Sequence, residues 1–400
     1  MIPFSPPKID QKVIDEVSDA LRSGWITTGP KTKLFEKKIA EYCKAEKVLC
    51  VNSATAGLEL VLRWFGVKEG DEVIVPAYTY CATANVVVHC GAKPVMADIN
   101  PDDFCISVKD ILSKITEKTK VIIPVDIAGF PCDYDSINSL VNSDDIKKKF
   151  SAESDEQKKL GRILVLSDAA HSIGAVYKGK KTGALTDITV FSFHAVKNLT
   201  TAEGGAIVFN LPEQFNKEEL YNYFNILTLH GQTKDALAKS KIGQWRYDVI
   251  FAGYKANMTD LQAAIGLAEI DRYDEETITR RKAIFDRYSK AFSKYSWAKL
   301  PVYEDQSRKS SYHVYLLRIN NITETQRDEI ITRIFEREVS VNVHFQPLPL
   351  LSVYKQLGYK MEDYPVSYQN YSCEISLPVY FDLTDEQVDV VVQAVVDSVE

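Results

Sequence analysis

Apolar residues gather in short runs along the first half of the chain, and stretches with helical spacing, such as Ala56–Phe65 and Thr83–His89, separate several of them. Strands of a parallel sheet are buried on both faces, so they show as near-continuous β-branched runs with helices between them. The pattern therefore predicts an α/β fold with a seven-stranded, mostly parallel sheet covered by helices on both faces. The predicted strands are Val48–Val51, Glu72–Val75, Pro94–Ile99, Lys120–Val125, Ile163–Ser167, Ile188–Phe193 and Gly205–Phe209.

A different pattern begins at about residue 260, where a long helical stretch, Asp260–Phe292, replaces the alternation. The last helix begins with a capping box, in which Thr384 and Gln387 can satisfy the first free amides, and Val388–Val399 forms its apolar face. We predict a large domain over residues 1–259 and a smaller C-terminal α/β domain over residues 260–400. Between its helices the smaller domain has a strand at Tyr312–Ile319, a helix at Glu324–Glu338, and strands at Ser340–Phe345 and Ile375–Val379.

Two parts of the predicted large domain lie outside the alternation. A helix-like stretch, Lys8–Arg22, leads into an irregular loop, Gly24–Pro30. Residues 142–162 are rich in Asp, Glu, Lys and Ser and have little apolar periodicity. We expect this segment to be a solvated surface insertion and assign it no function.

Composition excludes several classes of protein. The chain is 45% hydrophobic and 26% charged, as in ordinary globular proteins, and a formal net charge of −7 argues against nucleic-acid binding. The seven cysteines lack CxxC spacing and the six histidines lack HxxxH or HxH spacing, which favours reduced thiols and no metal site. The N-terminal residues have no signal-like apolar core and no run reaches membrane-spanning length, so we expect a cytoplasmic protein without a membrane partner.

One lysine, Lys197, lies between two of the predicted strands, in a loop of small and hydroxyl residues closed by Gly204 and Gly205. Desolvation at the end of buried strands favours the neutral amine, which is a nucleophile. The usual use of such a lysine is a Schiff base with a carbonyl compound or with pyridoxal 5′-phosphate (PLP). Taken alone, an ordinary solvated loop lysine is the commoner case.

Two further strand ends carry polar or small residues. The segment Val51–Gly57 joins a strand to a helix, and its small residues and free amides favour a phosphate at the helix N-terminus. A plain helix cap by Ser53 or Thr55 explains it equally well. Asp168 follows the strand at Ile163–Ser167 directly, which indicates a carboxylate that points into a site or caps a helix.

The carboxyl ends of parallel strands lie at one edge of a sheet, and ligands bind there. We therefore expect these three strand ends to meet at that edge. Together they would supply what PLP chemistry requires. Lys197 would form the imine and Asp168 would keep the pyridine nitrogen protonated. Thr55, Ala56 and Ser192 would hold the phosphate.

The order of the motifs resembles the DegT/StrS-type sugar aminotransferases, which are PLP enzymes of fold type I. The resemblance covers nearly the whole chain and is closest to members that aminate nucleotide-linked 4-keto-sugars. It is carried by Ser23-Gly-Trp-Ile-Thr-Thr-Gly-Pro30, Asn52-Ser-Ala-Thr-Ala56, Pro76-Ala-Tyr-Thr-Tyr-Cys-Ala-Thr83, Ser167-Asp-Ala-Ala-His171, the segment Ser192–Gly205, and Gly253-Tyr-Lys-Ala-Asn-Met-Thr-Asp260.

The family then implies roles for further residues. Tyr80 falls where an aromatic ring stacks on the pyridine face, and His171 falls where a glutamine commonly bonds the phenolic oxygen of PLP. Asn257 aligns with a residue that reaches the phosphate in the neighbouring subunit, which implies a homodimer with composite sites. Trp25 and Thr27, in the Gly24–Gly29 loop, align with substrate-side elements. His344 does so too, although a core histidine explains it at least as well.

The resemblance also implies a reaction. Relatives that deoxygenate sugars have a histidine in place of the Schiff-base lysine, so Lys197 favours transamination. An amino acid, glutamate by resemblance, would donate its amino group, and Lys197 would act as general base. A nucleotide-linked keto-sugar would accept the group. The sequence of the segment Ser192–Lys197 resembles that of members that aminate C4, which favours C4 as the acceptor position. The product would enter cell-surface polysaccharide or amino-sugar biosynthesis. Two alternatives stay open: a PLP-dependent sugar dehydratase or lyase on the same fold, and a catalytically silent regulatory protein.

Overall fold

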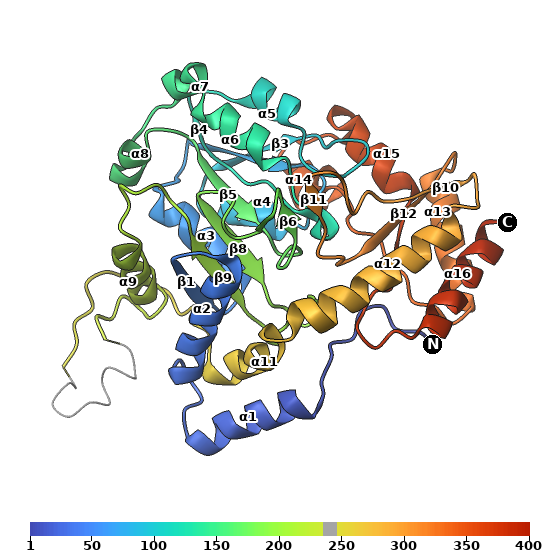
Figure 1. The fold of residues 1–400 in the computed structure, drawn as a ribbon. Coiled ribbons are helices and arrows are strands. Elements are labelled where there is room, and N and C mark those ends of the chain that lie inside the picture. The colour runs from blue at the N-terminus through green and yellow to red at the C-terminus, as the bar shows by residue number, and fades with distance from the viewer. Residues whose placement is uncertain (235–245) are drawn as a thin grey trace.

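A mixed seven-stranded sheet forms the centre of the computed structural model, which describes residues 1–234 and 246–400 (Figure 1). Its strand order is β1-β9-β8-β5-β4-β2-β3, and β9 alone runs antiparallel to both of its neighbours. The predicted mostly parallel sheet is therefore confirmed. Its strands are β1 (Lys47–Val51), β2 (Glu72–Pro76), β3 (Lys93–Ala97), β4 (Thr119–Ile122), β5 (Leu164–Asp168), β8 (Ile188–Ser192) and β9 (Gly205–Phe209).

Helices cover both faces of this sheet, because successive strand residues point to opposite sides. In β2, Val73 and Val75 pack in the cluster that contains α3 and α4, whereas Ile74 packs in the cluster on the other face. Near-continuous burial along each strand follows from this double coverage. The helices of this part are α1 (Gln11–Ser23), α2 (Pro30–Cys43), α3 (Ala54–Trp64), α4 (Ala82–His89), α5 (Val108–Lys114), α6 (Tyr134–Asn142), α9 (Lys217–Leu227) and α11 (Asp260–Ile270).

A smaller α/β unit follows, with its own apolar cluster around a three-stranded antiparallel sheet in the order β10-β12-β13. The predicted capping box is present, since Thr384 accepts from the amide of Gln387 and Gln387 caps in return. Its elements are α12 (Thr279–Phe292), β10 (Ala298–Lys299), β12 (Tyr315–Ile319), α13 (Glu324–Glu336), α15 (Pro365–Cys373), β13 (Glu374–Leu377) and α16 (Asp385–Val399). The π-helical turn η2 (Tyr273–Ile278) and α14 (Ser352–Gln356) belong to the same stretch of sequence, but their Tyr273 and Tyr354 pack in the clusters of the larger part. Short connecting elements are η1 (Ile127–Gly129), η3 (Leu348–Leu350), η4 (Met361–Asp363) and a small sheet of β11 (Arg308–Lys309), β6 (Val176–Tyr177) and β7 (Lys180–Lys181).

The helix predicted over Asp260–Phe292 is interrupted. It divides into α11, η2 and α12, and the apolar residues of α11 pack in the same cluster as Phe35 and Ile39 of α2. Asp260 explains this attachment, since its carboxylate accepts hydrogen bonds from the amides of Gly29, Lys31 and Thr32 at the start of α2. The domain boundary at 259/260 stays a prediction, with α11 attached to the larger part.

The predicted strand Ser340–Phe345 is wrong. The segment makes a single bridge to β13, between Asn342 and Ser376, and then leaves the sheet. The next two side chains, His344 and Phe345, line a cavity. Backbone pairing therefore ends at Asn342, and tertiary context overrides the strand propensity of the residues that follow.

The charged segment 142–162 has more structure than the sequence indicated. It contains two short helices, α7 (Asp144–Lys149) and α8 (Asp155–Leu160), and its Ile146 and Leu160 are buried. The buried Lys120 donates a hydrogen bond to the carbonyl of Ser151 at 2.5 Å, which fastens the segment to β4.

The N-terminal residues join the two units. Ile2 packs in the apolar cluster of the smaller unit, and its amide donates to the carbonyl of Glu338. The chain then crosses to α1, which packs against α11 (Figure 1). Both chain ends therefore lie beside the smaller unit.

Candidate active site

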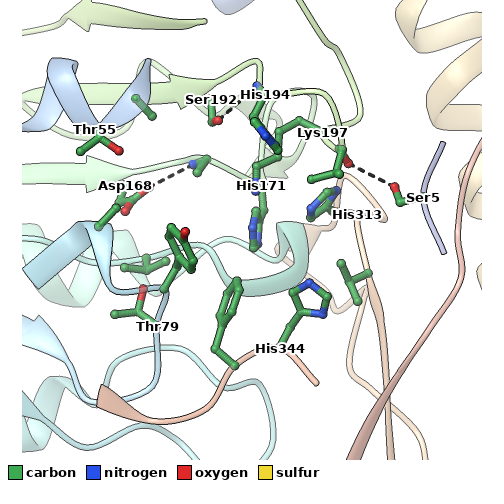
Figure 2. A pocket seen from close by; sticks show the side chains of 18 of the residues that line it. Ser5, Thr55, Thr79, Asp168, His171, Ser192, His194, Lys197, His313 and His344 are labelled. Atoms are coloured by element: carbon green, nitrogen blue, oxygen red, sulfur yellow. Dashed lines mark hydrogen bonds between the residues drawn. The ribbon is translucent and has the colours of Figure 1, made fainter. Parts of the chain in front are cut away.

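A cavity of about 540 Å³ lies where the carboxyl ends of the central strands face the smaller unit. Figure 2 shows side chains from both units around it. One side, here called the sheet wall, consists of Thr55, Asp168, His171, Ser192 and Lys197. The opposite side, here called the small-domain wall, consists of His313, His344 and Phe345.

The N-terminus of α3 forms one end of the sheet wall. Ser53 is the N-cap and accepts from the amide of Ala56 at 3.1 Å, while Ser53, Ala54 and Thr55 line the cavity. Gly205 allows this close approach, because a Cβ there would lie 2.6 Å from the nitrogen of Ala54. A helix N-terminus surrounded by small residues suits an anion such as a phosphate group.

Asp168 is the last residue of β5 and is only 5% exposed. Thr83 donates to its Oδ2 at 2.8 Å, and the amide of Ala170 donates to its Oδ1 at 3.3 Å. Burial raises the pKa of the Asp168 carboxyl, while these two hydrogen bonds and the charge of Lys197 oppose the rise. The predicted buried carboxylate is thus held in one orientation by donors that favour its ionised form.

Lys197 lies in the loop between β8 and β9. Hydrogen bonds from Thr200 Oγ1 and from the amide of Thr201 to the carbonyl of Phe193 close this loop. The Lys197 side chain keeps some solvent contact, but the protein around its amine lowers its pKa from 10.5 to about 8. Desolvation is the main cause, and the Asp168 charge acts in the opposite direction. The neutral amine, which a nucleophile or base requires, is therefore far more populated near neutral pH than in an ordinary lysine.

His171 has a defined tautomer. The backbone amide of Ala128 lies 3.2 Å from its Nδ1, and an amide can only donate, so Nδ1 accepts and Nε2 carries the proton. Burial holds the pKa of this imidazole well below its usual range, with the charge of Lys197 acting in the same direction. His171 therefore presents a neutral N–H donor, which is the same function that a glutamine amide would supply.

The small-domain wall contains two more neutral histidines. His313 stacks beside His171 with ring centroids 4.3 Å apart, and its Nδ1 lies 2.8 Å from Oδ1 of Asn198. His344 lines the cavity, and burial lowers its pKa to about 3. Phe345 lies 5.8 Å from the ring of His171 and 5.7 Å from that of Tyr80.

The N-terminal residues complete the cavity. The ring of Phe4 stacks on His344 at 5.4 Å, and Ser5 Oγ donates to the carbonyl of Val196 at 3.2 Å. Both residues line the cavity, and Figure 2 shows Ser5 beside the segment that carries Lys197.

The structure thus brings together seven of the residues singled out from the sequence: Thr55, Tyr80, Asp168, His171, Ser192, Lys197 and His344. Tyr80 is 59% exposed. Ala56 lies one residue further into α3 than this lining, and its amide is already bonded to Ser53.

Trp25, Thr27 and Asn257 do not line the cavity of their own chain as far as the structure describes it. Thr27 is held through its carbonyl, which accepts from the amide of Asp260. The Asn257 amide donates to Thr28 Oγ1 at 2.6 Å, and its buried Oδ1 has no partner in the described part of the chain.

Sequence reasoning missed several cavity residues, chiefly Phe4, Ser5, His313 and Phe345, and it missed Thr83, which bonds Asp168 from behind the lining. Thr83 stood inside a recognised motif, but its bond to Asp168 joins residues 85 positions apart and leaves no local signal. His313 and Phe345 lie more than a hundred positions after Lys197 in the sequence, and no local pattern marks them as cavity residues.

The chain matches the DegT/DnrJ/EryC1/StrS aminotransferase family over residues 7–396. It belongs to this family. Spore coat polysaccharide biosynthesis protein SpsC of Bacillus subtilis is 37% identical over 403 residues, which cover 100% of this chain and 97% of SpsC. The PMP-form of Spr1654, a proposed sugar aminotransferase of Streptococcus pneumoniae, is 47% identical with a TM-score of 0.95 over 100% of this chain and 99% of that one. PseC of Helicobacter pylori, an aminotransferase involved in the biosynthesis of pseudoaminic acid, is 28% identical with a TM-score of 0.86 over 99% and 98% of the two chains.

These comparisons confirm the predicted family, the fold type I architecture and PLP as the cofactor, since Spr1654 also has a PLP-form. The cavity fits the group. The α3 N-terminus suits its phosphate, Asp168 its ring nitrogen, Lys197 its aldehyde carbon and the Nε2–H of His171 its phenolic oxygen. No helix in the described part of the chain is long and apolar enough to span a membrane.

Proposed function

We propose that this aminotransferase moves an amino group from glutamate to a keto-sugar carried on a nucleotide, at C4 of the sugar, for polysaccharide or amino-sugar biosynthesis. One observation carries the transfer chemistry: a lysine with a lowered pKa and a buried carboxylate line the same cavity. The relation to sugar aminotransferases supports a sugar acceptor. The sequence of the segment Ser192–Lys197, which resembles that of family members that aminate C4, supports C4 as the acceptor position.

PLP, when bound, supplies an electron sink for the carbanion that forms at the donor's α-carbon. Lys197 is the group of this chain that can take a proton from that carbon and return it, because its amine is neutral above a pH of about 8. Its loop is tied to Phe193, so the amine stays within reach of one region of the cavity.

Asp168 holds the proton on the cofactor's ring nitrogen. The hydroxyl oxygens of Thr79 and Thr83 are 3.0 Å apart. Thr83 donates its one hydroxyl hydrogen to Asp168, so Thr79 is the donor in the bond between the two threonines. This series of hydrogen bonds fixes the carboxylate and favours its ionised form against the opposing effect of burial on its pKa.

An absorption experiment tests the first half-reaction. Purified protein supplied with PLP should show a yellow band that bleaches on addition of glutamate and returns with 2-oxoglutarate. A protein that binds no PLP would refute the aminotransferase assignment, and a yellow protein that glutamate leaves unchanged would refute glutamate as the donor.

The acceptor is tested with the bleached enzyme. Nucleotide-linked 4-keto- and 3-keto-hexoses are offered separately, and the return of the yellow band is followed. Return with the 4-keto compound alone supports C4. Return with the 3-keto compound alone would refute it, and return with a free keto-hexose at equal rate would refute the need for a nucleotide.

We also propose a homodimer whose sites are completed by the neighbouring subunit. Asn257 and the Gly24–Gly29 loop lie outside the cavity of their own chain, and Asn257 Oδ1 is buried without a partner in the described residues. Exposed apolar side chains on α1 and α2, including Ile14, Leu21 and Leu34, give a surface for a second copy. A phosphate contact would require the Asn257 amide to turn, so that Nδ2 points outward.

Mixed dimers test this arrangement. Lys197→Ala and Asn257→Ala subunits are each expected to be impaired, and their mixture should regain activity, because one site then combines Lys197 and Asn257 from different subunits. A mixture that stays as inactive as its components, with exchange verified by mass, would refute the composite site.

A further inference from the structure

A buried carboxyl group lies behind the small-domain wall and has no part in the proposed chemistry. Glu374 begins β13 and is 0% exposed. Its Oε1 accepts from Ser376 Oγ at 2.6 Å, and its Oε2 accepts from the backbone amide of His344 at 3.1 Å.

Ser376 connects this carboxyl group to the cavity. It is two residues further along β13, so its side chain lies on the same face as that of Glu374. Its Oγ is 2.9 Å from Nδ1 of His344. Glu374, Ser376 and His344 therefore form a continuous hydrogen-bonded chain that ends at an imidazole in the active-site cavity.

The His344 ring is held in place from other directions. Tyr78 Oη donates to the backbone carbonyl of His344 at 2.7 Å, and the ring of Phe4 lies nearly parallel to the imidazole, with an interplanar angle of 14°. No hydrogen bond to Nε2 occurs within residues 1–234 and 246–400. Nε2 is thus the ring atom left to meet a ligand.

The number of available hydrogens links the protonation of Glu374 to the tautomer of His344. A serine hydroxyl has one hydrogen. When Glu374 is ionised, Ser376 donates to it, so Nδ1 of His344 must donate to Ser376 and Nε2 keeps a lone pair. When Glu374 is protonated, it can donate to Ser376, Ser376 donates to Nδ1, and Nε2 carries the hydrogen.

We propose that Glu374, acting through Ser376, is a positioning residue that decides which nitrogen of His344 carries the proton, and so whether this imidazole accepts or donates a hydrogen bond in the cavity.

The groups around Glu374 set the pH at which the His344 tautomer changes. Burial raises the pKa of Glu374 to about 8, opposed by its two hydrogen bonds and by Arg327 and Arg318. Tyr78 and Cys373 also lie close enough to interact with its charge. His344 interacts with Lys197, His171 and His313, and its own pKa of about 3 keeps it neutral throughout.

The chemical class of ligand follows if the proposed function holds. Below the Glu374 pKa, an Nε2–H donor suits a carbonyl or carboxylate oxygen. Above it, an Nε2 lone pair suits a hydroxyl or amino group. An aminotransferase binds a carbonyl compound and releases an amine, so both forms of His344 have a partner.

The tautomer can be measured without any substrate. The holoenzyme is labelled with ¹⁵N-histidine, and solid-state ¹⁵N NMR distinguishes protonated from unprotonated ring nitrogens. Loss of one signal set in His344→Asn assigns His344 among the six histidines. We expect the Nε2–H form to dominate at a pH below the Glu374 pKa of about 8 and the Nδ1–H form above it.

Glu374→Gln provides the decisive variant. The backbone amide of His344 needs the amide oxygen, so the glutamine NH₂ must face Ser376 and reproduce the protonated state. We expect Nε2–H at every pH in this variant. Glu324→Gln is the matched control, because that carboxylate bonds Tyr368 and Tyr371 instead. A His344 tautomer that stays the same across pH in the wild type, or that titrates in Glu374→Gln as in the wild type, would overturn the proposal.

Ser376 separates this role from a merely structural one. Ser376→Thr keeps the hydroxyl and should keep the pH-dependent tautomer, whereas Ser376→Ala should abolish the dependence. A dependence that survives in Ser376→Ala would also overturn the proposal. Since the measurement involves no amino donor and no sugar, its outcome is independent of whether glutamate and a nucleotide-linked sugar are the substrates.

Discussion

The sheet wall and the small-domain wall of the cavity are built in different ways. Four of the five sheet-wall residues, Asp168, His171, Ser192 and Lys197, lie within thirty positions of one another, at or just after the ends of the adjacent strands β5 and β8. The fifth, Thr55, follows the end of β1. His313, His344 and Phe345 come from loops in a separate unit, and Phe4 comes from the far end of the chain. Chemistry that must be precise is carried by short segments at strand ends, whereas the surface facing it is assembled from distant segments that can vary with the ligand.

The largest effect is expected at the centre of the sheet wall. Lys197→Ala should abolish both half-reactions, since proton transfer by a positioned base alone contributes about 10²–10⁴-fold. Single-turnover bleaching and steady-state turnover measure this, with the surface variant Lys180→Ala as control. Turnover near the wild-type rate would show that the sheet wall does not carry the chemistry.

Asp168→Asn should be next, with a loss of about 10²–10³-fold in rate, because the amide cannot stabilise a proton on the cofactor's ring nitrogen. Circular dichroism should show an intact fold, since the Ala170 amide can still donate to the Asn oxygen and the Thr83 hydroxyl can accept from the Asn NH₂. Wild-type kinetics in this variant would remove the electron-sink role.

His344→Ala tests the small-domain wall. We expect the KM for the keto-sugar to rise about tenfold, the value of roughly one hydrogen bond to a ligand, while bleaching by the amino donor stays close to wild type. Comparable losses in both half-reactions would mean that the two walls share the chemistry.

The smallest effect is expected at His171. His171→Gln keeps an N–H donor at this position and should retain activity within about twofold, whereas His171→Leu should lose about tenfold through one missing hydrogen bond. The wavelength of the cofactor band gives a second measurement, because it responds to a donor on the phenolic oxygen. Equal kinetics and equal spectra in the two variants would refute the donor role.

The same contrast explains what the sequence could predict. The central strands were found because burial on both faces leaves a local apolar signal, and Asp168 and Lys197 were singled out because they stand at or shortly after the ends of such strands. The predicted strand at Ser340–Phe345 was wrong because its pairing ends at Asn342, and the sequence does not show that the next residues line a cavity. Glu374 could not be recognised at all, since a charged residue at a strand start is ordinary until its burial and its partners are known.

The path of the N-terminal residues has a consequence for how the enzyme matures. Ile2 packs against the unit that contains α16, and its backbone bonds Glu338 and Ser340. Phe4 then lies against His344. A segment early in the sequence therefore docks on segments that follow it by more than three hundred positions, and the cavity cannot close before those segments have been synthesised. The site is therefore completed only when residues 2–5 have docked on the folded smaller unit.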